Sequence, residues 1–209
     1  MAGNVKGILG RKLGMTQVWD DANRVVPVTV IEAGPCPVTM VRTEQSDGYA
    51  AVQLGFGAQK ERRVTKAERG HAAKAGLAAT PKVLREFRLA PNQTVEVGQT
   101  LTVEQFAAGD RVKVTGTNKG KGFQGVVRRH GFTGRPGSHG HPESRTPGSV
   151  GPGTDPSRVI KGKRMPGQMG GVKHSVINLQ VVQVDPEHNL IFVKGGVPGP
   201  RDSFVTITK

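Results

Sequence analysis

The sequence predicts a mainly β protein whose body is a closed barrel or a sandwich of strands. Short runs of β-branched and aromatic residues, which favour strands, recur along most of the 209-residue chain. Clusters of turn-forming residues separate these runs at short intervals, a pattern typical of barrels and sandwiches. A single segment carries the start and stop signals of a helix.

The predicted strands follow one another along the chain. The first, residues 25–31, is a β-branched run in which Pro27 indicates an edge or a strand start. Residues 83–89 alternate loosely between apolar and charged side chains, as a half-buried strand does. Asp-Pro-Glu-His-Asn at residues 185–189 predicts a hairpin turn. The other predicted strands are residues 38–41, 51–56, 100–103, 111–115, 175–184, 190–194 and 204–208.

One short helix is predicted near residues 66–75. Thr65 and Glu68 have the spacing of a capping box, in which the N-cap hydroxyl and the N3 carboxylate bind each other's backbone N–H. The alanines of this segment favour a helix, and Gly76 suits the position just after its end. Gly70 costs roughly 1 kcal/mol relative to alanine, so the helix should be short.

Residues 116–173 interrupt the strand pattern and divide the chain into two parts. This segment is rich in lysine, arginine, glycine and proline, has few large apolar side chains, and contains two acids, Glu143 and Asp155. It cannot bury enough apolar surface to offset the entropy of ordering it. We therefore expect a β body formed by residues 1–115 and 174–209, and an extended loop, 116–173, that a partner orders.

The net charge of +14 indicates a polyanionic partner. No apolar run reaches the roughly 18–20 residues that span a bilayer, and the basic residues do not follow a long amphipathic helix. Nucleic acid is therefore favoured over a membrane surface. Cys36 is the sole cysteine, which rules out an internal disulfide and fits a reducing compartment. We expect a cytoplasmic protein.

The glycine pattern of residues 120–125 resembles a dinucleotide-binding string, with Glu143 about 20 residues further on. That function needs a helix that opens at the glycines inside a βαβ unit. The arginines and glycines of residues 128–137 would interrupt such a helix. We therefore expect no nucleotide cofactor, and we interpret the glycines as turns or as points of close approach to RNA.

Histidines of the loop do not form a convincing metal site. His139 and His141 are close in sequence, and His130 and His174 could join them, but no carboxylate has a recognisable ligand spacing. Ser138 is merely next to His139, and no nucleophile-elbow string occurs. We expect no metal, no catalytic residue and no enzymatic activity.

The basic residues of the loop are spaced and interleaved with apolar side chains such as Phe123, Phe132 and Ile160. This pattern suits a segment threaded through structured RNA, where arginine and backbone N–H groups bind phosphates and apolar groups pack on bases. The alternative is a disordered, solvated charge run. The residues predicted to bind RNA are Arg11, Lys12, Lys119, Lys121, Phe123, Arg128, Arg129, His130, Arg135, His139, His141, Arg145, Arg158, Lys161, Lys163, Arg164 and Lys173.

Four segments resemble the large-subunit ribosomal protein L3 family of bacteria. Residues 7–16, GILGRKLGMT, are similar to the family's N-terminal signature, and residues 114–123, VTGTNKGKGF, to the entry into its central loop. Residues 145–151, RTPGSVG, and 161–170, KGKRMPGQMG, are similar to the return of that loop. The order and spacing of these motifs fit nearly the whole chain, which makes the resemblance specific.

The resemblance implies a closed barrel of the translation-protein type on large-subunit ribosomal RNA (rRNA), an early role in subunit assembly, and ribosomal proteins L14 and L19 as neighbours. It also implies a loop that reaches toward the peptidyl transferase centre, with Pro152, Gly153 and Thr154 near its tip. Some bacterial members carry an N-methylated glutamine at this tip, where this chain has Thr154, so we predict no such modification. Two alternatives stay open: a nucleic-acid chaperone outside the ribosome, and an enzyme that binds a nucleotide at residues 120–125.

Overall fold

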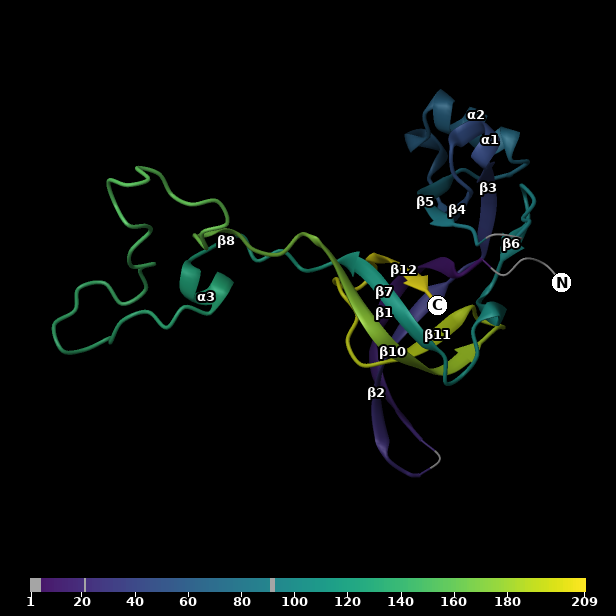
Figure 1. The fold of residues 1–209 in the computed structure, drawn as a ribbon. Coiled ribbons are helices and arrows are strands. Elements are labelled where there is room, and N and C mark those ends of the chain that lie inside the picture. The colour runs from purple at the N-terminus through teal and green to yellow at the C-terminus, as the bar shows by residue number, and fades with distance from the viewer. Residues whose placement is uncertain (1–4, 21, 91–92) are drawn as a thin grey trace. The chain divides into compact units, whose positions relative to one another are not determined.

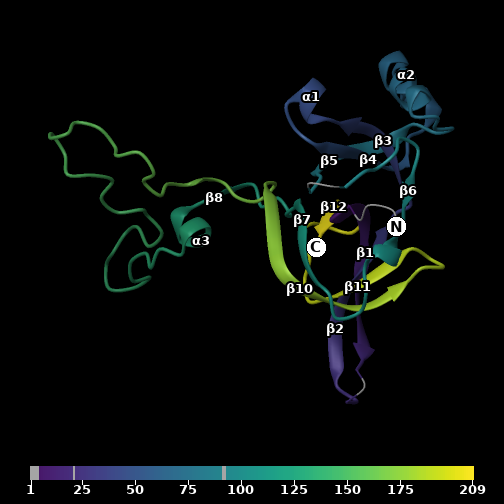
Figure 2. The same ribbon diagram turned by 45° about the vertical axis from the view of Figure 1, so that its right-hand side comes forward.

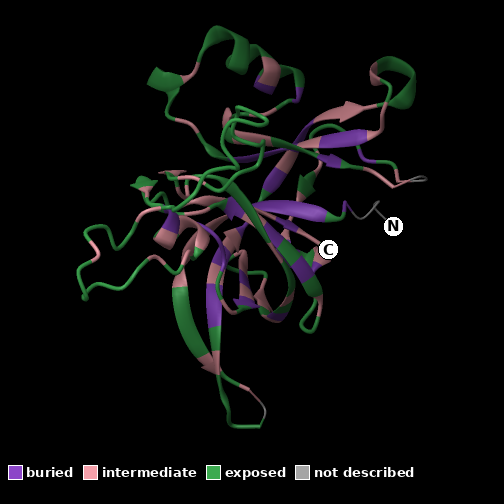
Figure 3. Cartoon of the chain, turned by 60° about the vertical axis from the view of Figure 1, so that its left-hand side comes forward, coloured by how far each residue is buried: buried purple, intermediate pink, exposed green. Residues whose placement is uncertain are grey.

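The computed structural model describes residues 5–20, 22–90 and 93–209. Internal contacts divide the chain into two units (Figure 1). The barrel unit comprises Met1–Thr117 and Lys173–Lys209, and the loop unit comprises Asn118–Val172, which is green in Figure 1. Buried residues concentrate in the strands of the barrel unit, whereas most of the loop unit is exposed (Figure 3).

Six antiparallel strands close into a barrel (Figure 2). These strands are β1 (Gly7–Trp19), β2 (Val25–Ala33), β7 (Arg111–Thr117), β10 (Lys173–Asp185), β11 (Leu190–Lys194) and β12 (Phe204–Thr208). Their order around the barrel is β1-β12-β7-β10-β11-β2, and β2 pairs back with β1. The predicted mainly β class is confirmed, and of the two architectures that the strand pattern allowed the barrel is the correct one.

Strand β1 was not predicted, because Gly7, Gly10 and Gly14 reduce the strand propensity of this segment. The structure shows why two of these glycines are needed. A Cβ at Gly7 would collide with the ring of Phe87, and a Cβ at Gly10 would lie 2.6 Å from the carbonyl oxygen of Glu32. The glycines therefore allow neighbouring groups to pack directly on the strand backbone.

A second sheet in the barrel unit contains β5 (Pro81–Arg88), β4 (Ala51–Ala58), β3 (Cys36–Arg42) and β6 (Thr100–Leu101), in that order. It shares one hydrophobic core with the barrel, and Phe56 meets Phe204 edge-to-face at a centroid distance of 6.1 Å. The last of these strands is shorter than predicted, because Val103 already belongs to a turn of 3-10 helix, η2 (Val103–Gln105).

The predicted helix is α2 (Lys66–Lys74), and both hydrogen bonds of its capping box are present. Two shorter helices, α1 (Glu44–Asp47) and α3 (Val126–His130), and a turn of 3-10 helix, η1 (Glu61–Arg63), were not predicted. A glycine with a positive φ directly follows α1 and α3, at Gly48 and Gly131. Each of these two helices therefore ends after about one turn.

The loop unit contains α3 and a small antiparallel pair of strands, β8 (Phe123–Gln124) and β9 (Gly167–Gln168). These two strands come from the beginning and the end of the unit. Its outgoing and returning segments therefore run side by side at this point.

Candidate nucleic-acid interface

Backbone hydrogen bonds join the two ends of the loop unit into a stalk, which we define as residues 118–124 and 167–172. Asn118 N–H donates to the Val172 carbonyl at 3.0 Å, and the Val172 N–H donates to the Asn118 side-chain oxygen at 3.0 Å. Lys121 N–H donates to the Met169 carbonyl at 2.8 Å. The predicted RNA-binding residues Lys119 and Lys121 therefore lie on braced backbone.

Gly170 is essential to the geometry of this stalk. Its φ is +73°, a conformation that side-chain-bearing residues rarely adopt, and a Cβ at this position would collide with the carbonyl oxygen of Lys119. The neighbouring Gly171 has a similar φ of +71°, but its Cβ would meet nothing closer than 3.9 Å. The close approach of the two segments therefore depends on Gly170 in particular.

Helix α3 fixes the returning segment near Met165. The side chain of Arg129 donates to the Met165 carbonyl at 2.7 Å, and the ring of His130 lies 3.1 Å from the same oxygen. Val126, on the same helix, is buried. Arg129 and His130 were predicted to bind RNA, and the structure gives both an internal contact within the loop unit. Arg128 is exposed.

Most of the predicted RNA-binding cations are exposed and have no acidic partner. Throughout the described part of the chain, ion pairs occur in the barrel unit alone. Unpaired like charges repel one another, and a polyanion relieves that repulsion. The exposed cations of the loop unit are Lys119, Lys121, Arg128, Arg135, Arg145, Arg158, Lys161, Lys163 and Arg164. Lys173, the first residue of β10, is exposed as well.

Apolar side chains are exposed among these cations. Phe123 is 74% exposed, Ile160 and Val172 are each 56% exposed, and Val150 and Val159 are each 43% exposed. Unstacked bases of RNA pack on such side chains, whereas duplex phosphates do not need them. The loop unit therefore combines groups suited to phosphates with groups suited to bases.

The tip residues Pro152, Gly153 and Thr154 are all exposed. The carbonyl of Thr154 accepts a hydrogen bond from the Ser157 hydroxyl, which closes a tight turn. His139 is exposed, and His141 accepts a hydrogen bond from the N–H of Glu143 at 3.1 Å. These contacts are local to the loop.

Arg11 and Lys12 differ from the loop cations, because the barrel unit itself uses their charges. The guanidinium of Arg11 lies 2.7 Å from a carboxylate oxygen of Glu32 and 3.8 Å from one of Asp202. The hydrogen bond to Glu32 raises the pKa of Arg11 above its ordinary value. The ammonium of Lys12 donates to the carbonyls of Val197 and Gly199 at 2.9 and 3.1 Å. Sequence alone does not reveal these partners.

A further cationic region lies outside the predicted RNA-binding residues. The segment 60–74, which includes η1 and α2, contains six basic residues and two acids. This local excess of basic residues is a sequence signal, although the same segment also carries the helix signals of α2. Its basic residues are Lys60, Arg62, Arg63, Lys66, Arg69 and Lys74, and all are exposed.

The geometry of the loop unit does not match a dinucleotide site. Strand β8 pairs antiparallel with β9, and α3 ends after five residues at Gly131. A nucleotide-binding βαβ unit needs parallel strands and a longer helix. Across residues 5–20, 22–90 and 93–209, no group of three or more potential metal ligands comes together. Over the same ranges, no helix combines the length and the apolar character needed to cross a membrane.

A closed barrel with its own core and an appended loop of unpaired cations define a basic β-barrel protein suited to a polyanionic partner. Residues 58–187 match the family model of ribosomal protein L3. Over 205 residues the chain is 53% identical to the large ribosomal subunit protein uL3 of Cutibacterium acnes, and the alignment covers 97% of this chain and 91% of that protein. The chain belongs to the ribosomal protein L3 family, which confirms the resemblance seen in the sequence.

Proposed function

We propose that this chain is a structural component of the large ribosomal subunit in the cytoplasm, and that its loop unit binds rRNA. The observation that carries the proposal is the set of exposed, unpaired cations held on the braced loop unit. Family membership and the name of the Cutibacterium acnes relative support the ribosomal setting. The role is scaffolding, with no catalytic group supplied by the protein.

Binding would draw its affinity from several sources that act together. Lysine and arginine release counterions when they neutralise phosphates, and arginine also forks to phosphate or stacks on a base. Exposed apolar side chains such as Phe123 and Ile160 would pack on unstacked bases. The mixture favours folded RNA with loops and bulges over a uniform duplex.

We further propose the finer features that family membership suggests. The exposed tip at Pro152, Gly153 and Thr154 reaches toward the peptidyl transferase centre. The protein acts early in subunit assembly, and ribosomal proteins L14 and L19 are its neighbours. The tip lacks the methylated glutamine of some bacterial members, because Thr154 stands in that position. Cross-linking from tip residues to rRNA tests its location, and an added methyl group at the tip in the intact mass would contradict the last point.

Two variants test the proposal in cells. The loop variant carries Arg158→Gln, Lys161→Gln, Lys163→Gln and Arg164→Gln. The barrel-control variant carries Arg111→Gln, Lys113→Gln, Lys194→Gln and Arg201→Gln, which remove the same charge from exposed positions of the barrel unit. We expect the loop variant to fold but to assemble poorly into large subunits, while the control assembles normally.

Co-sedimentation after a high-salt wash provides the readout. A ribosomal component stays with the large subunit, whereas a chaperone acting outside the ribosome is washed away. Normal retention of the loop variant would show that these four cations are a solvated surface and would overturn the proposed binding mode. Saturable binding of a nucleotide, lost on Gly122→Ala, would instead support the enzyme alternative.

A further inference from the structure

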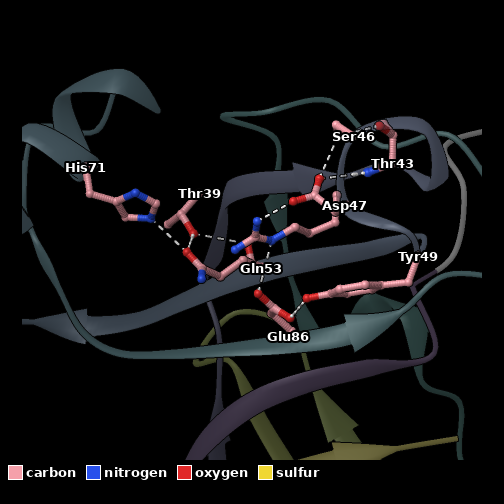
Figure 4. Close-up of polar contacts among 9 residues, drawn as sticks. Thr39, Thr43, Ser46, Asp47, Tyr49, Gln53, His71 and Glu86 are labelled. Carbon is pink, nitrogen blue, oxygen red and sulfur yellow. Dashed lines mark hydrogen bonds and ion pairs between the residues drawn. The ribbon is translucent and has the colours of Figure 1, made fainter.

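The segment formed by η1 and α2 is firmly attached to the second sheet of the barrel unit. His71 contacts the side-chain oxygen of Gln53 at 2.7 Å, and the hydroxyl of Thr39 donates to the same oxygen at 2.7 Å (Figure 4). Ala72, the next residue of α2, is buried. Gln59 connects the two helical pieces, since its amide donates to the Arg63 carbonyl of η1 at 2.9 Å and to the Glu68 carboxylate of α2 at 3.5 Å. One side of α2 is therefore held on the sheet.

The opposite side of α2 faces solvent and is basic. Lys66, Arg69 and Ala73 follow one another at spacings of three and four residues, which places them on one face of the helix, with Gly70 beside them. All four are exposed, and a Cβ at Gly70 would meet nothing within 4 Å. We call this surface, together with the preceding Lys60, Arg62 and Arg63 and the final Lys74, the α2 face.

Two acids, Glu68 and Glu86, are engaged in other contacts. Both Thr65 N–H and the Thr65 hydroxyl donate to the carboxylate of Glu68, at 2.9 and 3.0 Å. Glu86 accepts from Tyr49 at 2.8 Å and from Arg42 at 3.4 Å, and Figure 4 shows the contact with Tyr49. Glu61 is the remaining acid of the segment 60–74. The cations of the α2 face form no ion pair with any acid among the described residues.

The composition of the α2 face discriminates between possible partners. None of the large hydrophobic side chains exposed in the described structure lies in residues 58–90. Protein interfaces usually need aromatic or aliphatic anchors, and single-stranded RNA needs aromatic platforms for its bases. Phosphates of a double helix need neither, and the small Gly70 and Ala73 leave room for a close approach to the helix backbone.

We propose that the α2 face is a second RNA-binding surface, which contacts the phosphate backbone of double-helical RNA without help from the loop unit. The inference rests on the proposed role in binding rRNA and adds to it a different RNA form and different residues. The two surfaces would bind different features of RNA. The loop unit carries exposed large apolar groups that suit unstacked bases, whereas the α2 face carries none and suits the phosphates of a double helix.

Binding of the full chain to a perfectly paired RNA duplex of about 20 base pairs, measured at several salt concentrations, tests the inference. The α2-face variant carries Arg62→Gln, Arg63→Gln, Lys66→Gln and Arg69→Gln. We expect its affinity for the duplex to fall about tenfold or more at low salt. The slope of log K against log salt should become shallower by about 3 to 4, close to 0.9 for each lost phosphate contact.

Three comparisons keep the test specific. The charge-preserving substitutions Arg62→Lys, Arg63→Lys and Arg69→Lys should retain most of the affinity and the slope. The barrel-control variant should bind the duplex like the unaltered protein, and an equal loss in that variant would show that net charge alone matters and would overturn the inference. Unchanged unfolding midpoints for all variants confirm that each is folded.

Duplex binding of the α2-face variant that equals that of the unaltered protein would overturn the inference. If the α2-face variant binds the duplex normally but does not assemble into subunits, the α2 face contacts a protein instead. Failure of the proposed function is seen separately, in the loop variant, whose loss of assembly does not depend on Arg62, Arg63, Lys66 or Arg69. A loop variant that assembles normally would therefore contradict the proposed binding of rRNA by the loop cations without affecting the duplex measurement.

Discussion

Cys36 begins β3, is completely buried, and its thiol donates to the Leu9 carbonyl at 3.4 Å. Burial raises the pKa of this thiol to about 12. Because the thiolate is the reactive form, we predict that iodoacetamide at pH 8 does not label the folded protein and labels it fully in denaturant. Mass spectrometry measures both. Rapid, complete labelling of the folded protein would show that β3 opens readily or is exposed.

Gly170 and Gly171 form a matched pair for testing the stalk. A residue with a Cβ at a positive φ costs roughly 1–3 kcal/mol, and both glycines share that cost. Gly170→Ala adds a collision with the Lys119 carbonyl, so we predict that it opens the stalk further than Gly171→Ala does. Hydrogen exchange at the amides of Lys121 and Met169, which both donate across the stalk, measures the difference. Equal amide exchange in the two variants would show that the collision with the Lys119 carbonyl does not occur.

At the scale of single elements, α2 depends on its capping box. Thr65→Ala removes the N-cap hydroxyl and should destabilise the helix by roughly 1 kcal/mol. Thr43→Ala at the N-cap of α1 is the control, because that hydroxyl makes no capping hydrogen bond. Amide exchange in α2, measured with thermal unfolding of the whole protein, should respond to the first substitution and barely to the second.

The same capping box makes α2 sensitive to acid. The carboxylate of Glu68 accepts hydrogen bonds from the backbone N–H and the hydroxyl of Thr65. These bonds, the backbone one most strongly, lower the pKa of Glu68 below its ordinary value. A carboxyl whose pKa is lowered by folding contributes stability above its unfolded pKa and loses it as the pH falls through the folded pKa. We therefore predict faster amide exchange in α2 as Glu68 titrates, followed by NMR. A Glu68 carboxyl that titrates at its ordinary pKa would show that the capping box does not form in solution.

Elements with local signals were predictable, and those determined by tertiary contacts were not. Thr65 and Glu68 indicate α2 within four residues, whereas the glycines of β1 are explained by Phe87 and the Glu32 carbonyl, which lie far away in the sequence. The cations of the loop unit could be predicted to be unpaired from composition, because residues 116–173 contain two acids. Arg11 looked equivalent, yet Glu32, distant in sequence, neutralises it, and no local pattern reveals that partner.

At the scale of the whole molecule, the loop unit is inserted where β7 and β10 pair. Thr117 and Lys173 are direct partners in this pair, and the next residues, Asn118 and Val172, are joined by backbone and side-chain hydrogen bonds at 3.0 Å. The main hydrophobic core lies entirely in the barrel unit. The ends of the loop unit are therefore close enough for a hairpin turn to replace it.

We predict that replacing residues 118–172 with Asn-Gly leaves a barrel unit that folds cooperatively, since this dipeptide favours a two-residue hairpin turn. The removed segment carries ten cations and two acids, so the net charge falls from +14 to +6. The shortened protein should keep its far-ultraviolet circular dichroism and its duplex binding through the α2 face, but it should no longer assemble into large subunits. Non-cooperative thermal unfolding would show that the core of the barrel unit depends on the loop. Normal assembly would show that the barrel unit alone directs incorporation.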